Sequence, residues 1–109
     1  MSQSEPIFTH RIRSFIRRQG RLTPGQQYAL EHLWERYVLN PNEKFQDSNF
    51  FNPAKETILE IGFGNGESVL AMAQSIPERL FIGIEVHRPG VGHLLMQLEQ
   101  HQMNNVRVY

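Results

Sequence analysis

The chain has 109 residues, and its 11 Lys and Arg residues balance 11 Asp and Glu residues, so the formal net charge is zero. This length is near the lower end of the range for one domain, and a neutral total predicts no generally acidic partner. The chain has no cysteine, which excludes a disulfide framework, a thiolate nucleophile and a cysteine-based zinc site. Without an 18-residue apolar run or a signal-like N-terminus, we expect a soluble, cytoplasmic protein with no membrane partner.

The charges are distributed unevenly along the chain. Residues 1–22 contain five arginines and one acid, whereas acids outnumber Lys and Arg by ten to six in the remainder. Because residues 1–22 also lack a helix start signal and a sustained apolar stripe, we expect a basic arm that is flexible unless bound. Such an arm is either a solubilising tail or a contact to nucleic acid.

A helix is predicted to begin after Thr23, because Thr23 is a good N-cap, Pro24 suits the first helical position and Gln26 completes a capping box. The apolar residues that follow recur at helical spacing: Leu30, Leu33, Trp34, Tyr37 and Val38. We interpret this stripe as a packing face. Asn40 and Pro41 end the pattern.

The rest of the chain alternates between strand and helix patterns after an irregular stretch, 40–56, in which Phe45, Phe50 and Phe51 are expected anchors. Strands are predicted at 57–61 (buried), 80–85 and 106–109, and helices at 67–76 and 89–102. Such alternation predicts an α/β fold with right-handed crossovers and a parallel sheet. Three strands and two helices are half of a doubly wound sheet, so we expect this chain to be an N-terminal fragment of a longer protein.

The stretch "TILEIGFGNGES" places three glycines between a predicted strand and a predicted helix. Gly62, Gly64 and Gly66 give the spacing G-x-G-x-G, whereas the dinucleotide fingerprint is G-x-G-x-x-G and would need glycine where Glu67 stands. A carboxylate there would repel a pyrophosphate, which disfavours the alternative of an NAD-binding half-domain. The lysine and hydroxyl pair of a P-loop is also missing.

The acids around the loop favour a cationic ligand without phosphates, and S-adenosylmethionine has this chemistry. Glu60, at the end of the first strand, is placed to accept hydrogen bonds from its ammonium end. Glu85 ends the second strand, 19 residues after Gly66, where an acid is placed to bind ribose hydroxyls. The alternative is that the glycines form only a tight turn and the acids are solvated.

Three segments, "RSFIRRQGRLTPGQQ", "LEIGFGNGES" and "FIGIEVHRPGVG", together resemble the bacterial tRNA (guanine-N7-)-methyltransferases. The resemblance runs from about residue 12 to the end, interrupted at 40–55. It implies a Rossmann-like class I methyltransferase fold, of which residues 23–109 are the N-terminal half with three parallel strands, preceded by a helix and a basic arm. It also implies S-adenosylmethionine as methyl donor and N7 of a guanine in the tRNA variable loop as acceptor.

The resemblance assigns cofactor contacts to five positions: Glu60, Gly62, Gly64, Glu85 and His87. With this family match we favour RNA contact for the arm, first through Arg17, Arg18 and Arg21. The family's catalytic residues are expected beyond Tyr109, so we expect none among residues 1–109 and expect the chain alone to be inactive.

The methyl acceptor needs no general base, because guanine N7 has an in-plane lone pair and no proton at neutral pH. Holding donor and acceptor in line is then the main catalytic task. The alternative outside the enzymes is a non-catalytic fragment that only binds RNA. The sequence shows no metal-ligand grouping and leaves the oligomeric state open.

Overall fold

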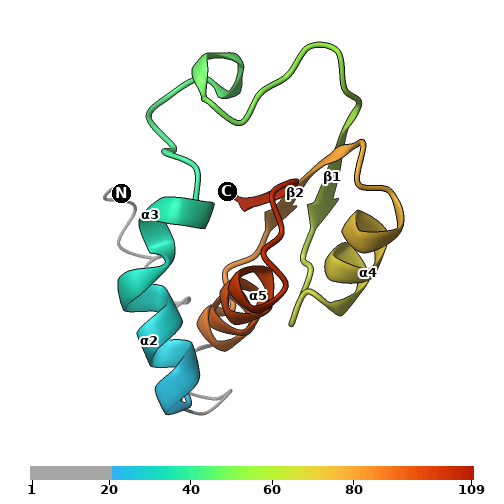
Figure 1. Ribbon diagram of the computed structural model, residues 1–109. Helices are drawn as coiled ribbons and strands as arrows, with labels where there is room; N and C mark the ends of the chain where they lie inside the picture. The colour runs from blue at the N-terminus through green and yellow to red at the C-terminus, as the bar shows by residue number, and fades with distance from the viewer. Residues whose placement is uncertain (1–20) are drawn as a thin grey trace.

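The computed structural model describes residues 21–109, so most of the predicted basic arm, with Arg17 and Arg18, lies outside the described residues. Figure 1 shows three strands and two crossover helices preceded by two short helices. The elements are α2 (Pro24–His32), α3 (Trp34–Tyr37), the 3-10 turn η1 (Phe45–Asp47), β1 (Thr57–Ile61), α4 (Glu67–Ser75), β2 (Leu80–Ile84), α5 (Arg88–Gln100) and β3 (Val106–Val108). The predicted alternation of strands and helices is confirmed.

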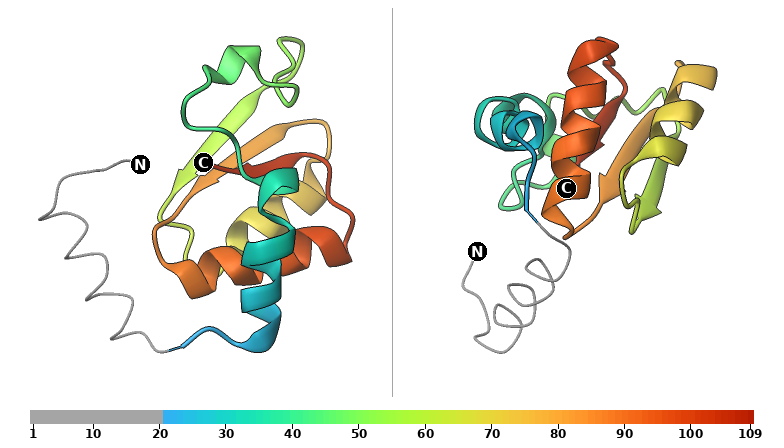
Figure 2. Two further views of the ribbon diagram at one scale, coloured as in Figure 1. Left: turned by 90° about the vertical axis from the view of Figure 1, so that its left-hand side faces the viewer. Right: turned by 90° about the horizontal axis from the view of Figure 1, so that it is seen from below.

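The strands form a parallel sheet in the order β1-β2-β3. Because both crossovers step in the same direction along the sheet and have the same hand, α4 and α5 cover the same face (Figure 2). On that face, Phe81 of β2 lies in register with Ile58 of β1 and Val106 of β3. These residues pack with the buried side chains of the two helices: Val69, Ala73, Val91, Leu94, Leu95 and Leu98. This layer is the core.

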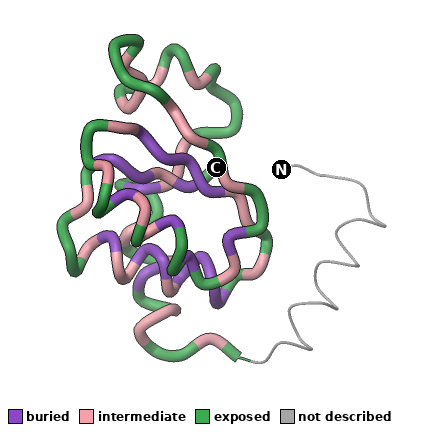
Figure 3. Tube along the Cα trace, turned by 90° about the vertical axis from the view of Figure 1, so that its right-hand side faces the viewer, coloured by how far each residue is buried: buried purple, intermediate pink, exposed green. Residues whose placement is uncertain are grey.

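The other face of the sheet is covered only in part, and the prediction that 57–61 is a buried strand is wrong. Leu59 and Ile61 are 55% and 73% exposed, because β1 is an edge strand of the described sheet and its alternate residues point away from α4 and α5. The central strand β2 is buried on both faces, and Figure 3 shows buried positions concentrated in β2 and α5.

The predicted start of the first helix is confirmed. The hydroxyl of Thr23 accepts a hydrogen bond from the Gln26 backbone N–H at 3.1 Å, and Gln26 Oε1 accepts one from the Thr23 N–H at 3.0 Å. This reciprocal capping box satisfies two backbone donors that would otherwise have no intrahelical partner.

The predicted packing stripe is only partly correct, because the helix breaks at Leu33 and continues as the short α3. Tyr37 is 3% exposed, and Leu30, Leu33 and Val38 pack against the core. Trp34 is instead 47% exposed. The backbone at Leu33 (φ −110°, ψ −1°) departs from helical geometry, so the residue after it leaves the stripe.

A carboxylate on α5 holds α3 in place. Glu99 accepts hydrogen bonds from the Tyr37 hydroxyl and from the Arg36 guanidinium, both at 2.8 Å. The Tyr37 hydrogen bond and the Arg36 cation hold the pKa of Glu99 below its usual value, whereas burial raises the pKa of Tyr37. Beyond α3, the N–H of Leu39 donates to the Val108 carbonyl at 2.7 Å, so the chain runs along the outer edge of β3.

The irregular segment 40–56 then crosses the sheet face that α4 and α5 leave open (Figure 2). The three phenylalanines predicted to anchor it form a cluster, with ring centroids of Phe45 and Phe51 5.2 Å apart and those of Phe45 and Phe50 6.4 Å apart.

Helix α5 ends two residues earlier than the sequence pattern predicts, in a Schellman motif. The Met103 N–H donates to the Leu98 carbonyl at 2.9 Å, and the Gln102 N–H donates to the Glu99 carbonyl at 3.2 Å. Gln102 has φ of 52°, a left-handed conformation that glycine usually supplies at this position.

We expect Gln102→Gly to raise the free energy of unfolding by about 0.5–1 kcal/mol, because it removes the steric cost of a left-handed non-glycine residue. Urea denaturation monitored by circular dichroism measures the change. Gln100→Gly, inside the last helical turn, is the matched control and should lose about 0.5–1 kcal/mol. Destabilisation by both substitutions would contradict the prediction.

Candidate cofactor-binding site

The glycine loop between β1 and α4 turns because each of its glycines has a left-handed backbone. The φ angles of Gly62, Gly64 and Gly66 are 73°, 65° and 83°, values that residues with a Cβ rarely adopt. The Gly66 N–H closes a turn onto the Phe63 carbonyl at 2.9 Å. The G-x-G-x-G spacing is therefore explained by three positions that need a positive φ angle.

The three glycines differ in their surroundings. A Cβ added at Gly62 or Gly64 would meet no atom within 4 Å, whereas one at Gly66 would lie 2.8 Å from Leu94 Cδ1 of α5. The backbone of the first two glycines is thus open to a ligand, and Gly66 permits close packing between the loop and α5.

The carboxylate of Glu85 joins the glycine loop to the end of β2. Its Oε1 accepts a hydrogen bond from the Gly64 N–H at 2.7 Å, and its Oε2 accepts from the N–H groups of Val86 at 3.0 Å and His87 at 3.1 Å. A carboxylate offers about four acceptor positions. Glu85 therefore orders the loop and retains acceptor capacity for one further donor.

The other two acids of the motif have different partners. Both carboxylate oxygens of Glu60 accept from the hydroxyl of Ser68, at 3.1 and 3.0 Å. Glu67 is exposed in the first turn of α4, where the helix dipole favours a negative charge. Sequence reasoning missed Ser68, whose spacing of eight residues from Glu60 matches no local motif.

The first turn of α5 packs directly on the loop. His87 is the N-cap residue of α5, and Gly90 lies so close to the loop that an added Cβ would overlap the carbonyl oxygen of Gly64. Sequence reasoning also missed this contact. The only signal for it in the sequence is Gly90 in "HRPGVG", because a glycine permits a close approach of two backbones.

The structure therefore brings together the five predicted cofactor positions at the carboxyl ends of β1 and β2. Arg21 is exposed and precedes the α2 N-cap by two residues. Within residues 21–109, no three His, Asp or Glu residues form a group that could hold a metal ion. No helix in the same range has the length and apolar character needed to cross a membrane.

A parallel open sheet with ligand-accessible glycines at the carboxyl ends of its strands defines a Rossmann-like α/β protein. The sequence profile of the family described as "Putative methyltransferase" matches residues 54–109, just over half of the chain, and the chain belongs to this family. The family expected from the sequence motifs is confirmed.

Curated relatives of the chain carry the name tRNA (guanine-N(7)-)-methyltransferase, and three of them match it as follows. The protein of Methylococcus capsulatus is 57% identical over 99 residues, which are 91% of this chain and 43% of the relative. That of Nitrosococcus oceani is 54% identical over 98 residues, 89% of this chain and 42% of the relative. That of Alkalilimnicola ehrlichii is 55% identical over 100 residues, with shares of 89% and 42%. The chain thus spans under half the length of these relatives.

Proposed function

We propose that this chain supplies the methyl-donor half-site of a tRNA (guanine-N7-)-methyltransferase. The donor would be S-adenosylmethionine and the acceptor N7 of a guanine in the tRNA variable loop. The observation that carries the proposal is the loop from Gly62 to Gly66, opened by three left-handed glycines and tied to the next strand by Glu85. The names of the relatives support N7 of a tRNA guanine as the acceptor, and the position in the variable loop rests on the resemblance of the sequence motifs.

The residues at the carboxyl ends of β1 and β2 fit this cofactor. Carboxylates suit its ammonium and ribose hydroxyls, and the open space above Gly62 and Gly64 admits a ligand close to the backbone. Glu60 would take the ammonium end, oriented by Ser68, and Glu85 would take a ribose hydroxyl. His87, at the start of α5, would border the same ligand.

The chemistry assigned to the chain is binding and orientation. S-adenosylmethionine supplies an electrophilic methyl group on a sulfonium, and guanine N7 attacks with its own lone pair. The described residues would hold the donor so that the methyl group faces the acceptor, which accounts for catalysis by proximity. Negative charge from Glu60 and Glu85 near the site favours the positive charge that develops on the base.

The arginines before α2 fit an RNA substrate. Arg17, Arg18 and Arg21 would contact tRNA phosphates, and each contact adds salt dependence to binding. Paired guanines in RNA hide N7 in a deep, narrow groove, so the target base must be exposed or unstacked.

Calorimetric titration with S-adenosylhomocysteine tests the donor site. The chain is expected to bind it, and Glu85→Ala is expected to weaken binding by about 10- to 100-fold. This loss of affinity corresponds to the free energy of a hydrogen bond to a charged group. The matched control is Glu78→Ala, which alters an exposed acid in the turn before β2 and should leave binding unchanged.

Two other outcomes separate the alternatives. Competition by NAD as strong as that by S-adenosylhomocysteine would favour a dinucleotide-binding half-domain. A folded chain that binds tRNA but not S-adenosylhomocysteine would overturn the donor half-site and favour an RNA-binding fragment.

A further inference from the structure

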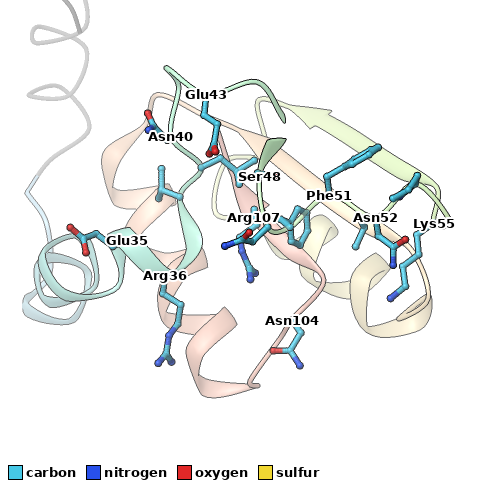
Figure 4. Close-up of a pocket in the computed structure, with 16 residues that line it drawn as sticks. Glu35, Arg36, Asn40, Glu43, Ser48, Phe51, Asn52, Lys55, Asn104 and Arg107 are labelled. Atoms are coloured by element: carbon cyan, nitrogen blue, oxygen red, sulfur yellow. The ribbon is translucent and has the colours of Figure 1, made fainter. Parts of the chain in front are cut away.

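A cavity of about 640 Å³ lies away from the glycine loop, between the segment 40–56 and the sheet face that α4 and α5 do not cover (Figure 4). Leu80, the first residue of β2, lines it, whereas Glu85 follows the last residue of that strand. The cavity and the glycine loop therefore lie towards opposite ends of β2.

Arg107 of β3 projects into this cavity (Figure 4). Its guanidinium carbon lies 4.7 Å from the ring centroid of Phe50 and 5.6 Å from that of Tyr37, so two aromatic rings lie within cation–π distance of it. Its Nη1 donates to the Val106 carbonyl at 2.7 Å. A guanidinium has five N–H donors, and among residues 21–109 only the Val106 carbonyl accepts from this one, which leaves most of its donors for a ligand.

No carboxylate within the described range neutralises Arg107. Two other arginines of the described range do form ion pairs: Arg36 with Glu99 and Arg79 with Glu56. Burial lowers the pKa of Arg107, and the other titratable groups that act on this pKa are Tyr37 and Arg36, with no carboxylate among them. A partly buried cation without a counter-ion favours an anionic ligand.

The other groups around the cavity are mainly hydrogen-bond donors. Lys55 adds a second cation, and the side-chain amides of Asn52 and Asn104 also line the space. The hydroxyl of Ser48, which lines it too, already donates to the Phe45 carbonyl at 2.8 Å. Glu35 and Glu43 line it too, but neither forms an ion pair with Arg107 within the described residues. The donors suit a small tetrahedral anion, because a planar guanidinium binds two oxygens of a phosphate at once.

We propose that this cavity is a phosphate-binding site centred on Arg107. The phosphate group comes either from an RNA backbone or from free inorganic phosphate. The proposal does not depend on the donor half-site at the glycine loop, because the two sites share no residue and each has its own ligand.

Two-dimensional NMR of the whole chain, titrated with inorganic phosphate in phosphate-free and sulfate-free buffer, tests the site. Saturable shifts are expected at the Arg107 Nε–Hε signal and at the side-chain amides of Asn52 and Asn104. Arg107→Met should weaken phosphate binding by at least about tenfold, the loss expected for a charge-assisted pair. Arg79→Met removes an arginine that does not line the cavity and should leave binding unchanged.

A second titration, with a single-stranded RNA decamer, distinguishes the two sources. RNA that shifts the same signals and competes with phosphate identifies the RNA backbone as the source, whereas phosphate binding alone identifies free phosphate. If neither titrant shifts the Arg107 signal of the folded wild-type chain, the proposal is wrong and Arg107 only anchors Phe50. The wild-type signal decides between these outcomes even if Arg107→Met fails to fold.

Discussion

Gly90→Ala is expected to lower the free energy of unfolding by about 2–4 kcal/mol, an overpacking cost at the upper end of the usual range. The new methyl group would overlap the carbonyl oxygen of Gly64 and lie 2.8 Å from its carbonyl carbon. These are backbone atoms, which cannot rotate away as a side chain can. The melting temperature should fall by about 10–20 °C for a domain of this size, measured by circular dichroism.

Gly25→Ala is the matched control, because Gly25 also lies in the first turn of a helix. Its added Cβ would meet the terminal methyl carbon of Met96 at 2.9 Å, and this flexible side chain can move. Alanine is also favoured over glycine in a helix by about 1 kcal/mol. Gly25→Ala should therefore be neutral or stabilising, and equal small effects at both positions would show that α5 does not press on the loop.

Features fixed by neighbours in the chain could be predicted from the sequence. The capping box of Thr23 and Gln26 forms between residues three apart, and the glycine spacing follows from backbone angles at Gly62, Gly64 and Gly66. The order of strands and helices follows from hydrophobic periodicity, which each segment carries by itself.

Features fixed by tertiary contacts could not be predicted in this way. Exposure of Leu59 and Ile61 depends on which face α4 and α5 cover. Exposure of Trp34 depends on a break at Leu33 that its apolar spacing does not reveal. The overlap between Gly90 and the loop requires knowing how closely α5 approaches it.

The three acids around the glycine loop combine features that could be predicted from the sequence with features that depend on tertiary contacts. A cationic ligand was the common explanation for Glu60, Glu67 and Glu85, yet each also has a local role. Glu67 lies at the positive end of α4, Ser68 donates to Glu60, and Glu85 accepts three backbone hydrogen bonds. The fold thus explains part of the acidity, and the remaining acceptor capacity of Glu60 and Glu85 is what a ligand would use.

Asn105 is the second position where a large effect is expected, because its amide joins α4 and the following turn to β3. The buried Nδ2 lies 3.1 Å from the Ala73 carbonyl oxygen, 3.2 Å from that of Arg79 and 3.5 Å from that of Ile76. Asn105→Ala should lower the free energy of unfolding by about 2–4 kcal/mol, since it removes the amide donor from the carbonyls of Ala73 and Arg79. Urea denaturation measures the loss, and Asn104→Ala, at an exposed neighbour, should stay within about 0.5 kcal/mol of wild type.

Asn105→Asp separates the lost donor from a lost volume, because the two side chains have nearly the same shape. The introduced carboxyl group would face the same carbonyl oxygens, which disfavour its ionised form and raise its folded-state pKa above the unfolded value of about 3.9. The free energy of unfolding of the Asn105→Asp variant, relative to wild type, is then highest below that unfolded pKa. This relative stability is lost as the pH rises through the folded-state pKa. Denaturation of both proteins at several pH values between about 4 and 7 should therefore show a widening gap in unfolding free energy. A gap that stays constant with pH would show that the Asn105 side chain acts through packing alone.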